Sequence, residues 1–220
     1  WKKQYILFSV HKRFNGKEGI IMTKKSRRYT KMNNKLEIVG IDHGWSNIKT
    51  ANTVFTTAVS HIANEPGVFD NILEYEGKYY SIGGKRLMVK DTKVTDDNFY
   101  LLTLAAIAKE LKTRGIYNVD IFLSVGLPLT RFGAEKENFI KYLSRKKEVV
   151  FKFEQETYRI NIIKVSVFPQ CYAAVSDRLS QYGRKHIIVD IGSWTIDLMT
   201  IRNMTPELSE CDTRPMGLIT

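Results

Sequence analysis

The sequence predicts an α/β fold in which a mixed sheet is flanked by helices. Residues 187–201 form an apolar run that breaks at Gly192 and resumes as an alternating run, which is typical of two antiparallel strands joined by a tight turn. Residues 39–50 repeat that pattern. An amphipathic helix from Thr95 precedes a nearly continuous apolar stretch at 119–125, as expected for a strand with both faces covered.

The two glycine hairpins share a spacing. Asp42, Gly44 and Ile48 match residues of the second hairpin, namely Asp190, Gly192 and Ile196, and each match lies 148 residues further along the chain. A single Asp-x-Gly turn between strands is usually only a turn. Two copies at one offset indicate two similar structural units.

Composition limits the class of protein. The 220 residues are 43% hydrophobic, which allows one large domain or two small ones with real cores. The net charge of +11 is concentrated in residues 1–31, which hold ten Lys or Arg and one acid, so the rest is nearly neutral and makes no case for a DNA groove. Two cysteines and no apolar run of about 20 residues favour a cytoplasmic protein without a membrane partner.

The basic extension, residues 1–31, has no sustained periodicity. It is either a flexible arm that contacts DNA or a membrane, or upstream sequence from an early start that does not belong to the native protein. The second alternative is favoured because Met32 stands just before the first good strand.

The first half of the chain predicts strands and one long helix. A strand at 36–41 leads into the turn at 42–47 and a return at 48–59, and 72–80 reads as an aromatic hairpin before a turn at Gly83-Gly84. The helix begins at Thr95, with Asp96 and Asp97 in its first turn, and ends at Gly115.

The second half alternates helices and strands. A charged amphipathic helix is expected at 132–143, and strands at 149–153 and 159–168 surround a polar turn at 154–157. Pro169 then opens a helix at 170–182, and the second glycine hairpin follows.

The two turns and the strand-to-helix junction at Gln170 indicate one phosphate site. Backbone amides of a turn form an anion-binding concavity, and a neighbouring carboxylate can hold the accompanying cation. Asp42 and Asp190 would bind Mg²⁺ directly or through water, Lys49 would neutralise a phosphate oxygen, and Gln170 would orient a water without titrating.

Each residue also has a purely structural explanation. Lys49 can be a strand-edge lysine, Gln170 a helix residue with no ligand, and Asp197 a solvent-facing strand residue; the shared spacing argues against all three together. The histidines and cysteines show no metal-ligand spacing, and no serine elbow, Walker loop or Rossmann fingerprint is present.

Four motifs occur in the order of the actin-like ATPase superfamily: D-H-G-W-S-N-I-K at 42–49, G-L-P-L-T at 126–130, F-P-Q at 168–170 and D-I-G-S-W-T-I-D at 190–197. Over residues 36–220 the chain resembles the ParM-type, plasmid-segregating branch with its actin-like-protein N-terminal domain. The resemblance implies an RNase H-like fold of the actin, chaperone and sugar-kinase superfamily.

The same resemblance implies a function and a site. The chain would bind ATP with Mg²⁺, hydrolyse the ATP, polymerise head to tail with itself and segregate plasmid DNA through a DNA-bound adaptor protein. Gln170 and Asp190 would be catalytic, and Asp42 would hold Mg²⁺ through water. The nucleotide-binding residues would be Asp42, Gly44, Trp45, Ser46, Asn47 and Lys49 in the first loop and Gly192, Ser193, Trp194, Thr195 and Asp197 in the second.

The expected organisation is a basic extension at 1–31, domain I with subdomains IA and IB at 32–183, and the second hairpin with the start of domain II at 184–220. Family members continue through a second domain whose glycine-rich loop holds the adenosine, so this chain is expected to be truncated. Trp45 and Trp194 are bulky for phosphate loops and would face the core or cover the base side of the cleft.

Two other functions are compatible with the residues. One is different work within the superfamily, as a sugar kinase or a chaperone-type ATPase. The other is a non-catalytic DNA-binding fragment that acts through residues 1–31. Sedimentation with ATP against ADP separates the filament hypothesis from the first. Steeply salt-dependent DNA binding that is lost on deletion of residues 1–31 would support the second.

Overall fold

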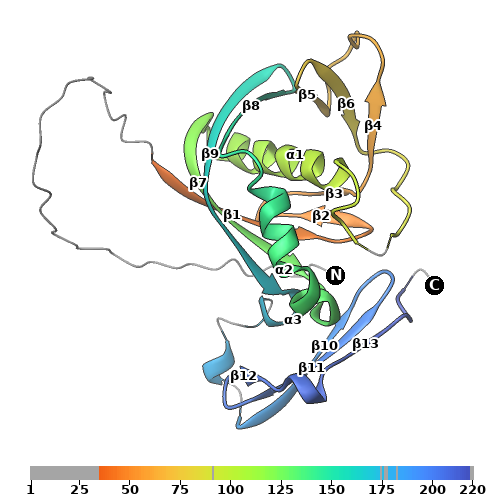
Figure 1. The fold of residues 1–220 in the computed structure, drawn as a ribbon, viewed down its shortest axis with the longest axis vertical. Helices are drawn as coiled ribbons and strands as arrows, with labels where there is room; N and C mark the ends of the chain where they lie inside the picture. Colours follow the sequence, from red (N-terminus) through yellow and green to blue (C-terminus); the bar gives the residue numbers. More distant parts are fainter. Residues whose placement is uncertain (1–34, 91, 174, 176–177, 182, 219–220) are drawn as a thin grey trace, which may run out of the picture.

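The computed structural model describes residues 35–218 apart from 91, 174, 176–177 and 182. Two sheets, one large and one small, meet at α3 (Figure 1). The predicted extension at 1–31 lies outside the described residues. Among the helices described, none is long and apolar enough to cross a membrane.

The larger sheet has nine strands in the order β3-β2-β1-β7-β9-β8-β5-β6-β4. The three central strands β1, β7 and β9 are parallel, whereas the outer pairs are antiparallel. The strands are β1 Leu36–His43, β2 Asn47–Lys49, β3 Val54–Thr56, β4 Val59–Ile62, β5 Ile72–Tyr75, β6 Lys78–Ile82, β7 Asn118–Leu127, β8 Glu148–Phe153 and β9 Glu156–Pro169. The predicted mixed sheet is therefore confirmed, and the single return expected at 48–59 is divided among three strands.

Helix α1, Asn98–Thr113, is buried on almost every side because it packs between strands of the larger sheet (Figure 1). Its predicted C-terminal stop is confirmed. Gly115 has φ +65°, its amide bonds to Lys112 O at 3.1 Å, and the next amide bonds to Leu111 O at 3.1 Å, which together form a Schellman motif.

The predicted start of α1 at Thr95 is wrong by three residues. The N-cap is Asp97, whose side chain makes no capping bond, and the first turn holds no acid. Asp96 and Asp97 instead pair with Lys90 and Arg145. Asp96 also accepts a bond from the Asn98 amide at 2.9 Å, so one local contact caps the helix while ion pairs with other segments hold both acids.

Helix α2, Leu129–Leu143, begins directly after Pro128 and not at Phe132 as expected. Pro128 has the extended ψ of 143° typical of a residue that precedes a helix, and its carbonyl accepts a bond from the Arg131 amide at 3.1 Å. The helix therefore starts where β7 ends, which brings its first turn close to the small sheet.

The small sheet contains β10 Lys185–Ile191, β11 Ile196–Arg202, β12 Thr205–Pro206 and β13 Asp212–Arg214, with β11 paired to the other three. It has its own apolar cluster, made by Leu129, Cys171, Leu179, Met199 and Ile201. The expected division into two units, with its boundary between 183 and 184, stays a prediction. Residues on both sides of that boundary join this cluster.

The prediction of one continuous helix at 170–182 is wrong for the part of the chain that the structure describes. Helix α3 covers Gln170–Ala173, and a 3-10 turn covers Leu179–Gln181. Gln170 nevertheless opens a helix directly after β9, as the Pro169 junction predicted.

Candidate functional site

The first hairpin joins β1 to β2 through a four-residue tip. Asp42 pairs with Lys49 and His43 with Ile48, so residues 44–47 form the turn. Gly44 is required there, because a Cβ at this position would lie 2.6 Å from the Asn47 carbonyl oxygen. Lys49 Nζ donates to Asp42 Oδ2 at 2.9 Å, so this hairpin carries a neutralised pair at its base.

The second hairpin, β10 to β11, repeats this construction. Asp190 pairs with Asp197 and Ile191 with Ile196, which leaves residues 192–195 as the tip. A Cβ on Gly192 would lie 3.0 Å from the Thr195 carbonyl oxygen, just as the Gly44 position meets Asn47. The predicted repeat is therefore confirmed as a structural one, with the same loop length and the same register.

The charges at the two hairpin bases differ. Lys49 of the first hairpin corresponds to Asp197 of the second, so an acid and a base face each other in one and two acids in the other. Asp197 is buried; its burial raises the pKa of the carboxyl, and Asp190 adds to the rise, although Thr213 Oγ1 donates to Asp197 Oδ1. The second hairpin is therefore the one that a cation would stabilise.

Gln170 connects the two hairpins. Its Nε2 donates to Asp42 Oδ1 at 2.7 Å. The next residue, Cys171, places its sulfur in a group with carboxylate oxygens of Asp190 and Asp197 whose members all lie within 4.8 Å of one another. Burial raises the pKa of the Cys171 thiol, which keeps it neutral beside the two acids. The aspartates of both hairpins thus meet at the first turn of α3.

Gly126 makes room for Gln170. A Cβ on Gly126 would lie 2.7 Å from Gln170 Cγ. Gly126 pairs with Phe168 across β7 and β9, one residue before the Leu127–Pro169 pair. The glutamine side chain therefore lies across the end of β7, where any other residue would displace it.

Two side chains of the first tip point into the protein. Trp45 packs edge-on against Phe99 at 5.1 Å, and Ser46 is buried with no bonding partner for its hydroxyl among the described residues. Trp45 thus faces the core, one of its two expected orientations. Asn47, Ser193, Trp194 and Thr195 are partly exposed. The first tip therefore offers its backbone to a ligand.

Lys93 lies beneath the first tip and was not among the site residues predicted from the sequence. It is buried, its Nζ donates to the His43 carbonyl, and its ammonium lies 5.8 Å from the Trp45 ring centre. Burial lowers the pKa of Lys93 to about 8, although Asp42 counteracts the shift. It stands in a loop without periodicity, so no sequence signal marked it.

His43 is also buried beside the tip. Its Nε2 lies 2.8 Å from Thr103 Oγ1, whose own hydroxyl donates to the Phe99 carbonyl, so His43 Nε2 is the donor. Burial, together with the nearby charge of Lys93, lowers the pKa of His43 to about 3. His43 is therefore a neutral structural residue.

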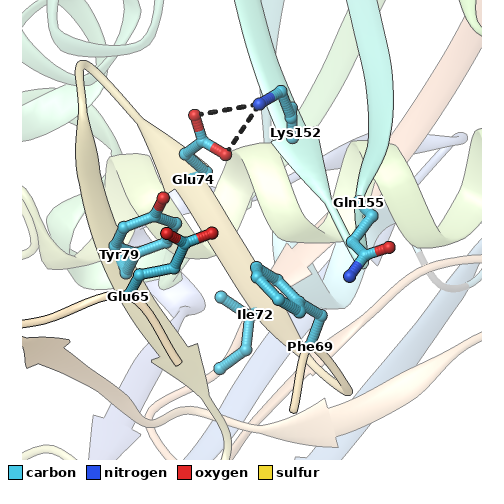
Figure 2. Close-up of a pocket in the computed structure, with 7 residues that line it drawn as sticks. All are labelled: Glu65, Phe69, Ile72, Glu74, Tyr79, Lys152 and Gln155. Atoms are coloured by element: carbon cyan, nitrogen blue, oxygen red, sulfur yellow. Dashed lines mark hydrogen bonds and ion pairs between the residues drawn. The ribbon is translucent and has the colours of Figure 1, made fainter. Parts of the chain in front are cut away.

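A surface pocket elsewhere does not belong to this site. It is lined by Glu65, Phe69, Ile72, Glu74, Tyr79, Lys152 and Gln155, as Figure 2 shows. Lys152 Nζ donates to both oxygens of Glu74, at 3.0 and 3.2 Å. These residues come from β5, β6, β8 and adjoining loops, whereas the hairpins lie at β1, β2, β10 and β11. The pocket is therefore separate from the site that the two hairpins form.

Comparison with protein families gives one match. Residues 40–172 match the model described as the N-terminal domain of actin-like proteins. No curated protein sequence matches the chain.

Solved structures with a similar fold include filament proteins. The apo ParM protein of psk41 has a TM-score of 0.69 at 16% identity, with 84% of this chain and 68% of that chain covered. Ta0583, an archaeal actin homologue, has a TM-score of 0.66 at 22% identity, with 82% and 62% covered; it has also been solved with ADP. The AlfA filament bound to AMPPNP has a TM-score of 0.63 at 17% identity, with 84% and 71% covered.

These likenesses show the fold, which is that of the actin-like proteins. The chain spans about two thirds of the length of the structures it matches. One of these three proteins, AlfA, has been solved as a filament. Ta0583 has been solved with ADP, and the AlfA filament with AMPPNP.

Proposed function

Because the chain belongs to the family of actin-like protein N-terminal domains, we propose that it is a cytoplasmic, ATP-hydrolysing protein that polymerises into filaments to segregate plasmid DNA. One observation supports the catalytic part of this proposal above all others. The two hairpins with one loop geometry meet at Gln170, whose side chain bonds to Asp42 and whose neighbour Cys171 adjoins Asp190 and Asp197.

The two tips would hold the phosphates of one ATP molecule. Each tip presents backbone amides, and Lys49 at the base of the first adds a positive charge for a phosphate oxygen. Partly exposed residues of the second tip, Ser193 and Thr195, add hydroxyls. Amides on two sides of a polyphosphate chain would fix its position, which is most of what phosphoryl transfer requires of a protein.

The acids of the second hairpin suit Mg²⁺. Asp190 and Asp197 offer hard oxygen ligands with no lysine opposite, which is the donor chemistry that Mg²⁺ prefers. Asp42 would contribute through water, since its two oxygens already accept bonds from Gln170 and Lys49. When bound, the ion would neutralise charge on the β- and γ-phosphates.

Gln170 would position the attacking water. Its Nε2 donates to Asp42, which leaves the amide oxygen Oε1 to accept a hydrogen bond from a water. An amide does not titrate, so Gln170 would orient the water whatever the pH, while Asp190 would help to hold the metal ion. The proposed catalytic pair is thus Gln170 and Asp190.

Replacing Gln170 tests this assignment. We expect Gln170→Ala to slow phosphate release by about 10²-fold to 10³-fold, as the loss of a positioned group usually does, while ATP binding stays close to that of the wild type. Single-turnover phosphate release and calorimetric binding measure the two quantities. Gln181→Ala, at an exposed glutamine of the 3-10 turn, is the matched control. Normal turnover in Gln170→Ala would remove the glutamine from the mechanism.

Two further parts of the proposal are self-association and binding to a plasmid adaptor. The family match and the similar structures that are filaments support them. AlfA of a B. subtilis plasmid has been solved as a filament, and so has Alp12. We propose that this chain likewise contacts copies of itself head to tail and reaches plasmid DNA through a DNA-bound adaptor protein.

A further inference from the structure

The first tip is held from inside the protein by Thr57. The hydroxyl of Thr57 donates to the Gly44 carbonyl at 2.7 Å, and its backbone amide donates to the Ser46 carbonyl at 3.0 Å. Thr57 is fully buried, and its own carbonyl accepts a bond from the Leu87 amide at 2.9 Å. One fixed residue therefore holds two carbonyls of a four-residue tip.

The second tip has the same two carbonyls held by different atoms. The Leu218 amide donates to the Gly192 carbonyl at 3.1 Å, and the Gly217 amide donates to the Trp194 carbonyl at 3.2 Å. Gly192 and Trp194 are the repeat equivalents of Gly44 and Ser46. Two unrelated segments thus make the same pair of contacts, one through a side chain and an amide and the other through two amides.

The direction of these carbonyls sets the direction of the amides. In a planar trans peptide, the C=O of one residue and the N–H of the next point in opposite directions, and none of the described peptides is cis. A carbonyl held by a hydrogen bond on one side therefore turns the following amide toward the opposite side. In the first tip these amides belong to Trp45 and Asn47, and in the second to Ser193 and Thr195.

We propose that Thr57 is a positioning residue of the phosphate site, which holds the first tip so that the amides of Trp45 and Asn47 face the bound phosphate. This inference rests on the proposed ATP-binding function. Lys93 supports the same tip by its bond to the His43 carbonyl, one residue before the glycine. The second tip has its counterpart in the amides of Gly217 and Leu218, which no substitution other than proline removes.

The Thr57 hydroxyl can be tested apart from its amide. Thr57→Val keeps the size of the side chain and the amide bond to Ser46 but removes the bond to Gly44, whereas Thr57→Ser keeps both. Calorimetric titration of the full chain with Mg–ATP should show binding weakened about tenfold in Thr57→Val and close to wild type in Thr57→Ser, since a hydrogen bond contributes about 1 kcal/mol. Thr56→Val, at the neighbouring strand residue, is the control for the Thr-to-Val change.

A measurement on the wild type covers the case in which Thr57→Val does not fold. Addition of Mg–ATP should shift the backbone amide resonances of Trp45, Asn47, Ser193 and Thr195 more than that of Gly192, whose N–H is already bonded to the Thr195 carbonyl at 2.8 Å. Wild-type affinity in Thr57→Val, or the largest shifts outside these four amides, would overturn the inference. A wild type that does not bind Mg–ATP would instead refute the proposed function.

Discussion

At the scale of single residues, Gly126 acts on the site by having no side chain. Its hydrogen stands where a Cβ would lie 2.7 Å from Gln170 Cγ, so the glutamine owes its position to this glycine. We expect Gly126→Ala to displace Gln170 from Asp42 and to slow phosphate release nearly as much as Gln170→Ala, with ATP binding little changed.

The control for the Gly126→Ala variant is a glycine on the neighbouring strand. A Cβ on Gly40 of β1 would meet no atom within 4 Å, so Gly40→Ala should leave phosphate release unchanged. In a double-mutant cycle, Gly126→Ala should have no further effect when Gln170 is already alanine. Additive losses would mean that Gly126 acts through some other part of the strand.

The buried His43 makes the stability of the fold depend on pH. Burial lowers its pKa from 6.5 to about 3, so between these values the unfolded chain binds a proton that the folded chain does not. The stabilisation is complete above pH 6.5 and falls as the pH drops toward 3, with a slope of up to about 1.4 kcal/mol per pH unit from this group.

Urea unfolding between pH 7.5 and pH 4 measures that slope. His43→Gln, which keeps a donor for Thr103, should make the dependence shallower, whereas His61→Gln on the exposed face of β4 should not. An unchanged slope in His43→Gln would show that His43 is not the group responsible.

Single residues also show where sequence reasoning stops. Asp42, Lys49 and Gln170 could be predicted because a repeat and a strand-to-helix junction marked them, and the structure brings all three into contact. Thr57 and Lys93 could not, because they lie in irregular segments and act through carbonyls of residues far from them in the chain. Contacts of this kind depend on tertiary structure, which the hydrophobic periodicity of the sequence does not reveal.

At the scale of elements, the two hairpins have one geometry but are attached differently. Helix α1 anchors the end of the first through Glu110, a buried acid that accepts bonds from Thr50 Oγ1 at 2.7 Å, Asn52 Nδ2 at 2.7 Å and Arg114 Nη2 at 2.6 Å. Burial alone would raise the pKa of Glu110, but these donors outweigh it and lower the pKa. The carboxylate therefore ties the β2–β3 connection to the helix.

Removing this carboxylate should destabilise the fold. We expect Glu110→Ala to lower the free energy of unfolding by about 3 kcal/mol, because Arg114 and two polar partners then lose a buried acceptor. Denaturant unfolding at pH 7 measures the change. Glu137→Ala, at an exposed acid of α2, should cost less than about 0.5 kcal/mol, and an equally small loss in Glu110→Ala would contradict the anchoring role.

Element type was predicted better than element boundaries. The hairpins, the central strand β7 and the glycine stop of α1 follow from local patterns in the sequence. The start of α1 and the length of α3 do not. Asp97 pairs with Arg145 from another segment, and Leu179 joins the apolar cluster of the second sheet, so tertiary contacts decide both ends.

At the scale of the whole molecule, two sheets with separate cores meet at α3, where Gln170 bonds to Asp42 and Cys171 adjoins Asp190 and Asp197. The family match and the solved relatives show the actin-like fold that the four ordered motifs had suggested. The chain spans about two thirds of those structures. We therefore confine the proposed function to these residues, which would hold Mg–ATP between two loops.

Calorimetric titration with ATP, with and without Mg²⁺, tests that claim most directly when one residue of each hairpin is replaced. The wild type should bind one Mg–ATP per chain. Lys49→Met should weaken binding about tenfold or more and keep the dependence on Mg²⁺, whereas Asp190→Asn should weaken binding and reduce that dependence. Undiminished binding in either variant would contradict the account, because only one loop would then hold the nucleotide.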